Sequence, residues 1–443
     1  MLNRIGSIMA EAKDLNTHRL QNKERIIELA YISSLCDESK VSDFIIVPFM
    51  KEEEDFLTML IHNPNFTELN DAAKWADTLL RGFALISAEH RVFTLDAARI
   101  IRSATPQTQV ETAIMGSQIA LSEDLIDSIN IIRNRYPSPE LAVEETTLGN
   151  VSRTRTMLVF DNRRVDPTVL ANVRESLRKL DVDFVQAAGQ LERLISGRKH
   201  SLFPTMLITE RPDRVTGSLQ AGKVVLLLQG SGFALIMPAT FFEFMSAVDD
   251  EFDSFWMTRF LIILRYGAII LTILLPSLYV AVVSYNPELF RVQLAFSIAG
   301  SRSAVPYPSF IEVMIMLFMI ESLIEASVRL PKYIGSTATT VGGLILGQAA
   351  QQAGLVSSIM IIVTSVVAIS NFVVPVNNMS VAIRFLKYPL LVPAIFFGLS
   401  GVAVGIFVYL VYLADLRSFG KPYFRILGPT KRHKGDIGQV KPS

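Results

Sequence analysis

Hydrophobic and polar positions divide the 443-residue chain into two parts of different character. Residues 1–259 hold 64 of the 84 charged side chains and mix short apolar and polar stretches, whereas residues 260–416 hold only 12. The second part contains charge-free runs as long as a crossing of a ~30 Å hydrocarbon core requires. The pattern predicts an α/β soluble region followed by an all-α membrane domain, and it excludes one uniformly soluble globule.

Four apolar runs in the second part predict membrane-spanning helices. They cover residues 266–284, 309–330, 355–374 and 389–414. Residues 333–354 are also free of charge but rich in Gly, Thr and Gln, which favours a re-entrant segment shielded by protein over a further crossing. The sequence therefore predicts a polytopic domain of four to five spans.

Basic residues after the last run indicate the orientation of this domain. Lys and Arg near span ends stay on the cytoplasmic side of a membrane. The run is followed by Arg417, Lys421, Arg425, Lys431, Arg432 and Lys434. An even number of crossings is therefore favoured, because it places the N-terminal region and the C-terminal tail both in the cytoplasm. That count leaves Arg384 and Lys387 on the opposite side.

The soluble region contains one local arrangement twice. A helix ended by glycine and followed by a hairpin is predicted at residues 71–95 with Gly82, and again at residues 211–237 with Gly222. We interpret this as two α/β subdomains of related plan, and the alternative is chance recurrence of a few residue types. The predicted domains are an N-terminal α/β subdomain 1–120, a second α/β subdomain 121–255, a helical transmembrane domain 256–416 and a basic cytoplasmic tail 417–443.

Local patterns before these units predict further elements. Residues 23–35 have the pattern of a helix, and residues 44–49 form a strand-like apolar run. The acidic residues 52–55 suit the first turn of a helix, where the dipole favours negative charge. Residues 156–160 predict the strand that corresponds to 44–49, and residues 166–180 predict a helix after it.

Composition excludes several classes of function. The 42 basic and 42 acidic residues give no net field for nucleic acid. Cys36 is the single cysteine, so no internal disulfide forms, and we expect it to be a small buried hydrophobe in a reducing cytosol. The first residues lack the apolar stretch of a secretory signal. The five histidines have no ligand spacing and nucleotide-loop or hydrolase motifs are missing, so we expect no enzyme, catalytic residue, metal site or cofactor.

A combination of short motifs resembles the A subunits of GerA-type spore germination receptors of endospore-forming bacteria. The motifs are 105–108 (TPQT), 202–205 (LFPT), 209–213 (TERPD), 305–308 (VPYP), 329–331 (RLP), 341–343 (VGG), 347–350 (GQAA), 417–420 (RSFG) and 422–423 (PY). The resemblance implies a spore inner-membrane receptor complex with a transporter-like B subunit and a lipoprotein C subunit. It also implies that A subunits form a homo-oligomeric ion channel, which releases monovalent cations when a nutrient germinant binds.

Acidic side chains inside the second apolar run are the candidate ion pathway. Glu321, Glu325 and Arg329 fall on one helical stripe, and Glu312 lies near the opposite side, closer to an interface. Ionisable groups at membrane depth persist mostly where they line water or pair. A ring of Glu321 carboxylates, one per protomer, would attract cations, whereas Glu325 has the alternative of pairing with Arg329 only to support helix packing.

Small residues in the membrane domain predict close helix contacts. Gly343 with Gly347, and Gly401 with Gly405, have the spacing that lets helices approach closely. Gln348, beside Gly347, has the functional alternative of a polar contact that lines a pore in a re-entrant loop. Packing is the simpler interpretation for these glycines.

Residues 209–213 predict the start of a helix in the soluble region. Thr209 offers a capping hydroxyl, Pro212 suits an early helical position and Asp213 favours the dipole. The alternative is a contact with a neighbouring subunit through Arg211, beside Glu210. The acidic residues 249–253 are either solvated or part of a cation vestibule.

Three functions compete. The first is a subunit of a ligand-gated channel for monovalent cations, which contacts membrane lipid and lines its pore with the acidic run. The second is a non-conducting scaffold that couples a sensor subunit to downstream proteins. The third is a proton-coupled transporter with Glu321 as a relay, against which the lack of clear inverted repeats counts.

Overall fold

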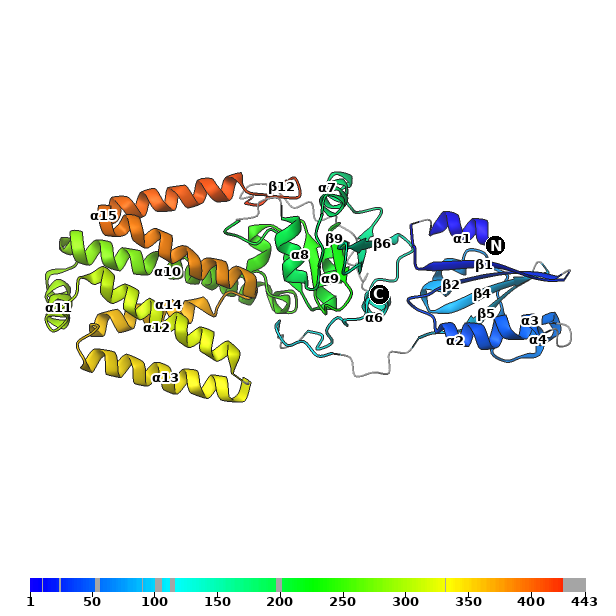
Figure 1. The fold of residues 1–443 in the computed structure, drawn as a ribbon, viewed down its shortest axis with the longest axis horizontal. Coiled ribbons are helices and arrows are strands. Elements are labelled where there is room, and N and C mark those ends of the chain that lie inside the picture. The colour runs from blue at the N-terminus through cyan, green and yellow to red at the C-terminus, as the bar shows by residue number, and fades with distance from the viewer. Residues whose placement is uncertain are drawn as a thin grey trace, which may run out of the picture.

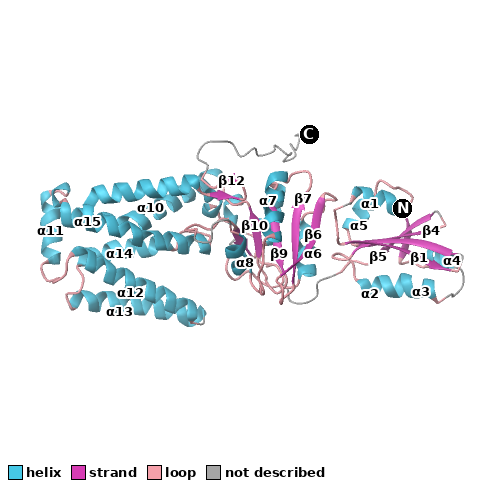
Figure 2. Ribbon diagram, turned by 45° about the horizontal axis from the view of Figure 1, so that its top comes forward, coloured by secondary structure: helices cyan, strands magenta, loops and turns pink. Residues whose placement is uncertain are grey.

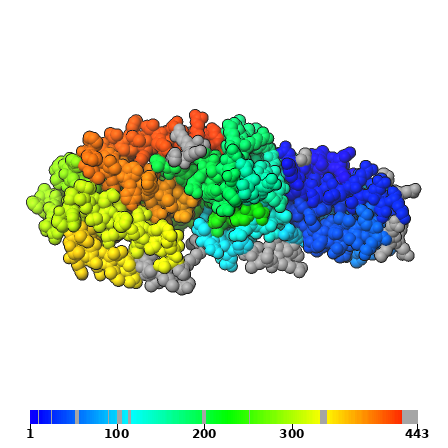
Figure 3. Space-filling model, viewed as in Figure 1, coloured from blue at the N-terminus to red at the C-terminus, as the bar shows by residue number. Residues whose placement is uncertain are grey.

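The computed structural model describes residues 1–424 except residues 10, 24, 52–55, 90, 100–105, 112–115, 197–200 and 331. Two α/β subdomains and a helical domain follow one another along the longest axis of the molecule (Figure 1). The space-filling view shows an elongated protein in which each part touches the next (Figure 3). The N-terminal subdomain and the helical domain therefore lie at opposite ends, with the second subdomain between them.

The N-terminal subdomain has an antiparallel sheet of order β1-β2-β4-β5-β3 covered on both faces. One face carries α2, η1, α3 and α4, and the other carries α1 and α5. The strands are β1 (Leu15–Asn22), β2 (Arg25–Ile32), β3 (Phe66–Glu68), β4 (Phe83–Ala88) and β5 (Arg91–Asp96). The helices are α1 (Leu2–Ile8), α2 (Glu38–Val41), η1 (Ser42–Ile46), α3 (Val47–Met50), α4 (Phe56–His62) and α5 (Trp75–Leu80).

The second subdomain has an antiparallel sheet of order β6-β7-β9-β10-β8. One face carries α7 and α8, and the other carries α6 and α9. The strands are β6 (Leu141–Leu148), β7 (Thr154–Asp161), β8 (Leu207–Thr209), β9 (Val224–Leu228) and β10 (Ala234–Met237). The helices are α6 (Leu125–Arg135), α7 (Pro167–Arg178), α8 (Ala188–Ile195) and α9 (Pro212–Gln220), followed by η2 (Phe241–Met245) and η3 (Val248–Glu251).

The two subdomains have the same plan, as the repeated helix, glycine and hairpin predict. In each sheet the strands lie in the order first, second, fourth, fifth, third, and one helix precedes the first strand. Gly82 and Gly222 occupy equivalent positions after α5 and α9, with φ of 86° and 79°. Such left-handed backbone favours glycine, so both residues end their helices for the same reason.

Two of the elements predicted for the N-terminal subdomain are wrong. Residues 25–32 form β2 instead of a helix, and residues 44–49 belong to the helical turns of η1 and α3 instead of a strand. β2 is a central strand buried on both faces along most of its length, so its apolar residues do not alternate. Residues 44–49 are apolar on both faces of these helical turns, because Phe44 and Val47 are exposed while the opposite face packs in the core. The sequence therefore shows an unbroken apolar run. The acidic residues 52–55 lie outside the described residues.

The helical domain consists of antiparallel segments that run toward and away from the second subdomain (Figure 2). Its helices are α10 (Phe255–Tyr285), η4 (Pro287–Leu289), α11 (Val292–Arg302), α12 (Ser309–Arg329), α13 (Lys332–Gln352), α14 (Ser358–Asn371) and α15 (Asn377–Asp415). α11 lies at the tip farthest from the soluble subdomains, and α13 lies beside α12 at one edge (Figure 1). Large apolar side chains are exposed over this domain, among them Phe318, Phe396 and Phe407.

α15 is a hairpin of two helical arms and not the single last span that the sequence predicts. Gly398 has non-helical backbone angles, φ 59° and ψ −136°, and the hydroxyl of Tyr409 donates to the carbonyl of Leu386 at 2.7 Å. A Cβ on Gly401 would lie 2.0 Å from the carbonyl oxygen of Pro393, and one on Gly405 would lie 2.4 Å from Leu390. The close helix contact predicted for this glycine pair is therefore confirmed.

Among the described residues, α10 and α15 have the length and composition of membrane-crossing helices, although the 39 residues of α15 are divided between its two arms. α14 has 14 residues, about 21 Å of helix, which is shorter than a ~30 Å hydrocarbon core. Residues 332–352 form one continuous helix, α13, in place of the predicted re-entrant segment. An α-helix satisfies its own backbone hydrogen bonds, so this polar run needs no irregular turn. The predicted count of four to five spans is not confirmed.

The start of the predicted tail is folded against the second subdomain. β11 (Arg417–Ser418) and β12 (Lys421–Pro422) form a short hairpin, the hydroxyl of Ser418 donates to the carbonyl of Thr205 at 2.6 Å, and Lys421 pairs with Asp166. Tyr423 is fully buried among aromatic rings of this subdomain. The remaining tail, residues 425–443, lies outside the described residues.

Candidate functional site

The predicted pore residue Glu321 lies in a cluster of three charges within the helical domain, which we call the Glu321 cluster. Its Oε1 is 2.8 Å from Nζ of Lys387, and its Oε2 is 3.7 Å from Nη1 of Arg384. Glu321 belongs to α12 and is 28% exposed, whereas Lys387 on the first arm of α15 is 0% exposed. Two cations therefore face one carboxylate between two apolar helices.

Sequence reasoning missed the roles of Arg384 and Lys387, which it placed outside the membrane. The sequence does contain a signal for these roles, because Arg384 and Lys387 are the only charges between two long charge-free stretches, residues 333–383 and 388–414. A lysine inside such a stretch needs a counter-charge at membrane depth. Charge-free length alone did not indicate that Glu321, 66 positions earlier, is that partner.

Glu325 and Arg329 form a pair on the surface of α12. Nη2 of Arg329 lies 2.6 Å from Oε1 of Glu325, and both side chains are mostly exposed. This is the pairing that the sequence offered as the alternative to a pore role for Glu325. The pair does not contact the Glu321 cluster through any hydrogen bond among the described residues.

Glu312 of α12 is buried at the far end of the domain, where it contacts α11, α14 and, through the hydroxyl of Tyr279 at 3.4 Å, α10. Its carboxylate accepts from the backbone N–H of Ser357 at 2.6 Å and from the Ser357 hydroxyl at 2.5 Å. Nε of Arg302 lies 3.3 Å away. These contacts hold the first turn of α14 against α12, and Glu312 is fully buried within the protein.

The small residues of α13 differ in their surroundings. A Cβ on Gly343 would lie 3.3 Å from Leu323 of α12, whereas a Cβ on Gly347 would meet nothing within 4 Å. Gln348 is exposed on the same helix. The α12 contact therefore uses Gly343, and Gly347 and Gln348 face away from it.

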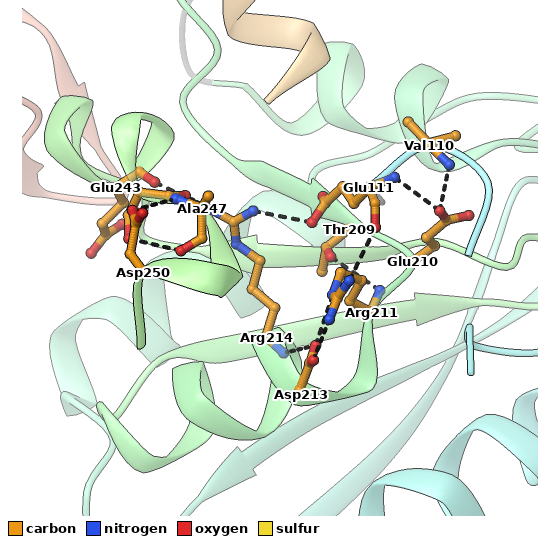
Figure 4. A network of polar contacts seen from close by, with 11 residues as sticks. Val110, Glu111, Thr209, Glu210, Arg211, Asp213, Arg214, Glu243, Ala247 and Asp250 are labelled. Carbon is orange, nitrogen blue, oxygen red and sulfur yellow. Dashed lines mark hydrogen bonds and ion pairs between the residues drawn. The ribbon is translucent and has the colours of Figure 1, made fainter. Parts of the chain in front are cut away.

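The residues predicted at the start of α9 lie together in a polar network (Figure 4). The Glu210 carboxylate accepts three backbone N–H groups, from Gln109, Val110 and Glu111, at 2.6, 2.6 and 3.0 Å. The guanidinium of Arg211 donates to both carboxylate oxygens of Asp213 at 3.1 and 2.6 Å. Arg211 is buried and is itself the N-cap residue, so Thr209 is not the cap.

Electrostatics within this network follow from burial and pairing. Burial would raise the pKa of Asp213, but the Arg211 guanidinium outweighs it and holds that pKa below its usual value. Pro212 at the first helical position and Asp213 in the first turn are as predicted. The fork of Arg211 is occupied within its own chain.

The same network reaches the first helix of the helical domain. Arg214 donates to the Glu111 carboxylate at 3.0 Å and to the carbonyl of Ser246 at 2.8 Å. Asp250 accepts from the backbone N–H of Ala247, and it pairs with buried Arg265 of α10 at 2.5 Å. Asp250, within the acidic run 249–253, is thus an anchor for α10.

A partly buried carboxylate that sequence reasoning missed lies where the second subdomain meets α15. Glu192 on α8 accepts from the side-chain amide of Asn378 at 3.2 Å. Burial raises the pKa of Glu192 to about 7, against the opposing effects of Arg193 and Asn378. A single glutamate in an amphipathic helix gives no sequence signal of this environment.

The described residues contain no cluster of His, Cys, Asp and Glu that could hold a metal ion. Cys36 is buried and its thiol donates to the carbonyl of Gly82 at 3.3 Å. Burial raises the pKa of this thiol to about 12, so it is not a nucleophile at neutral pH.

Taken together, the duplicated α/β region, the apolar helical domain and its paired internal charges define a membrane-associated protein with a soluble region at one end. Residues 3–440 match the family described as Bacillus/Clostridium GerA spore germination protein. The chain belongs to this family, as the motif resemblance predicts. Its relatives include spore germination proteins of Bacillus.

Spore germination protein B1 of Bacillus subtilis (strain 168) is 34% identical over 406 residues, which are 89% of this chain and 84% of that protein. Spore germination protein KA of the same organism is 32% identical over 91% of this chain and 76% of that protein. The N-terminal domain of the A subunit of the Bacillus megaterium spore germinant receptor GerK3 is a solved structure that covers 54% of this chain and 94% of its own, at 21% identity and a TM-score of 0.42.

Proposed function

We propose that this chain is the membrane subunit of a nutrient-germinant receptor that triggers spore germination, and that its copies assemble into a ligand-gated channel for monovalent cations. Its proposed place is the spore inner membrane, with the soluble subdomains and the C-terminal tail on the cytoplasmic side. Its proposed partners are a transporter-like B subunit, a lipoprotein C subunit and further copies of itself. Family membership supports the role in germination.

The Glu321 cluster carries the proposal for ion conduction. An ionisable side chain at membrane depth costs at least ~2.5 kcal/mol on insertion scales, and this cluster places three of them at one level of two helices. The Glu321 carboxylate binds cationic side chains, and a permeating cation can replace one of these side chains at the carboxylate. Acidic rings of this kind select cations in channels.

The edge position of α13 supports assembly of several copies. α13 packs against α12 at one edge of the helical domain (Figure 2). Its Leu344, Ile345 and Gln348 are exposed. Gly347 has open space around its Cα, which suits the close approach of another helix. A second copy on this face would place α12 and α13 of neighbouring protomers side by side around a central axis.

A non-conducting scaffold is the alternative, and one observation favours it. Every carboxylate of α12 is paired in the described residues: Glu312 with Arg302, Glu321 with Lys387 and Glu325 with Arg329. Paired charges of this kind also serve only to fix helix positions.

Reconstitution of the full-length chain separates these functions. The purified protein would be placed in potassium-loaded liposomes with its B and C partners, and oligomer mass and potassium efflux would be measured before and after addition of an amino acid and glucose mixture. The channel predicts a closed oligomer and triggered efflux. A monomer, or an oligomer that never conducts, supports the scaffold instead.

A further inference from the structure

The Glu321 carboxylate is already occupied by a cation of its own chain. Both cationic partners come from one helical arm, residues 377–397, and the shorter contact is the 2.8 Å pair with Lys387. Lys387 is fully buried, so its ammonium cannot leave the carboxylate for water without movement of the arm or of the lysine stem. The cluster carries two positive charges against one negative.

An ammonium and a monovalent metal ion compete for the same carboxylate. Both carry one positive charge, and at equal separation their Coulomb attraction to the carboxylate is the same. While Lys387 is in contact, its repulsion and that of Arg384 exclude a further cation. Removal of the ammonium would leave a partly exposed carboxylate, which is the kind of group that attracts cations in a channel.

The arm that carries Lys387 is continuous with the core of the second subdomain. Leu386, next to Lys387, belongs to one buried cluster with Leu227 and Ile236 of the second sheet. At the start of the arm, Asn378 donates to Glu192 of α8. A displacement of the second subdomain would therefore move the arm, and with it the ammonium, relative to Glu321 on α12.

We propose that Lys387 is a tethered counter-cation that occupies the Glu321 site in the resting receptor and determines when a monovalent cation can enter. Movement of the 377–397 arm withdraws the ammonium and exposes the carboxylate. Arg384 contributes the same repulsion from 3.7 Å and is the weaker partner. This inference rests on the proposed channel function, and it assigns the residue that keeps the channel closed.

The test compares potassium retention by spores in buffer without nutrients. Lys387→Met removes the ammonium and keeps a buried apolar stem, and we expect at least a tenfold faster basal loss of potassium. Lys387→Arg keeps a cation and should retain potassium as the wild type does. Glu321→Gln combined with Lys387→Met should not leak, because the carboxylate that attracts cations is gone. Amounts of the chain and of its partners are compared in each strain.

Chemical rescue gives a second readout. In membranes from a Lys387→Cys strain, aminoethyl methanethiosulfonate would restore an ammonium at this position, whereas methyl methanethiosulfonate would not. The strain also carries Cys36→Ala, so the thiol introduced at position 387 is the only one in the chain. We expect the charged reagent alone to suppress the leak. A leak that both reagents suppress equally overturns the proposal.

The outcomes also separate this inference from the channel function. Normal retention by an assembled Lys387→Met receptor, together with nutrient-triggered release that Glu321→Gln abolishes, overturns the tethered cation and leaves the channel. Triggered release that is unaffected by Glu321→Gln contradicts the channel function itself.

If the Lys387→Met chain does not accumulate, the nutrient threshold for release is measured in Arg384→Gln instead, because this variant keeps the 2.8 Å pair between Glu321 and Lys387. An unchanged nutrient threshold in that variant overturns the proposal, and a lower one supports it.

Discussion

At the scale of single residues, buried charge explains how the parts of this chain are held together. Arg133 of α6 is 0% exposed and contacts Asp14 of the N-terminal subdomain through Nε at 2.7 Å and Nη2 at 2.6 Å. The hydroxyl of Ser34 donates to the same carboxylate at 2.6 Å. Loss of one partner of a buried pair leaves the other charge without compensation, which is the main cost.

Asp14→Ala should therefore lower the free energy of unfolding by ~3–5 kcal/mol. Asp77→Ala is the matched control, because Asp77 pairs with Arg81 at 2.8 Å on the exposed surface of the same subdomain. Its expected cost is at most ~1 kcal/mol. Urea unfolding of the full-length chain in detergent measures both. Equal effects of the two substitutions would contradict this account of the subdomain contact.

Glu192 makes the junction with α15 sensitive to pH. Its pKa of about 7 in the folded state lies above the ordinary value of 4.5, so the folded chain binds this proton more tightly than the unfolded chain does. The resulting stabilisation is complete below about pH 4.5 and is lost as the pH rises through 7.

Thermal unfolding of wild-type and Glu192→Gln chains across pH 4.5 to 8 tests this. The wild type should lose up to ~3 kcal/mol over this range. Glu192→Gln keeps an acceptor for Asn378 and carries no charge, so it should lack this component. Parallel pH profiles of the two proteins would show that Glu192 is not the group responsible.

At the scale of elements, glycines determine where helices end and where they touch. Gly401 lets the backbones of the two arms of α15 approach each other closely, since its missing Cβ would lie 2.0 Å from the Pro393 carbonyl oxygen. Gly347 of α13 has the same predicted role in sequence, but nothing lies within 4 Å of its Cβ position. The structure thus separates a glycine that is required within the protomer from one that is not.

Gly401→Ala should destabilise the α15 hairpin, because a contact of 2.0 Å forces backbone to move, with an expected cost of ~1–3 kcal/mol or more. Gly347→Ala should stabilise the isolated chain slightly, by up to ~1 kcal/mol, through helix propensity. Membrane yield and melting temperature in detergent measure both effects. A Gly401→Ala chain as stable as wild type would exclude close packing of the arms.

Particular elements show how far the sequence predicts the fold. Both hairpins and the glycines before them could be predicted, because turn residues and short alternating strands are local signals. β2 could not, since a strand buried on both faces has the apolar density of a helix. The α15 hairpin could not, because a continuous apolar run does not reveal that Gly398 reverses the chain.

The candidate site also has features that the sequence could predict and features that it could not. Glu321 is a candidate because its charge stands within an apolar run, and that prediction needs no knowledge of its partner. Its contact with Lys387 depends on packing between α12 and α15, which spacing along one helix cannot give. Glu210 and Arg211 were predicted as neighbours of a helix start, but their bonds to residues 109–111 depend on how the linker between subdomains folds back.

At the scale of the whole molecule, one buried core joins the soluble and helical parts. Val225 and Leu227 of the second sheet, Met379 and Ile383 of α15 and the docked Tyr423 belong to a single cluster. The polar network from Glu111 through Arg214 reaches the segment that anchors Arg265 of α10. Motion of the soluble region therefore has two direct connections to the helices, one to α10 and one to the arm that carries Lys387.

The central claim is that the Glu321 carboxylate lies on the path of cations released during germination. Potassium release from spores after addition of an amino acid and glucose mixture tests it most directly, with Glu321→Gln compared against Glu325→Gln. The control changes the same residue type one turn along the same helix, in an exposed pair. With equal amounts of assembled receptor, we predict that Glu321→Gln spores release potassium at least about tenfold more slowly than the wild type, which corresponds to a loss of ~1.4 kcal/mol or more of cation stabilisation. Glu325→Gln spores should release potassium at the normal rate. Release at the wild-type rate in both strains would contradict the claim.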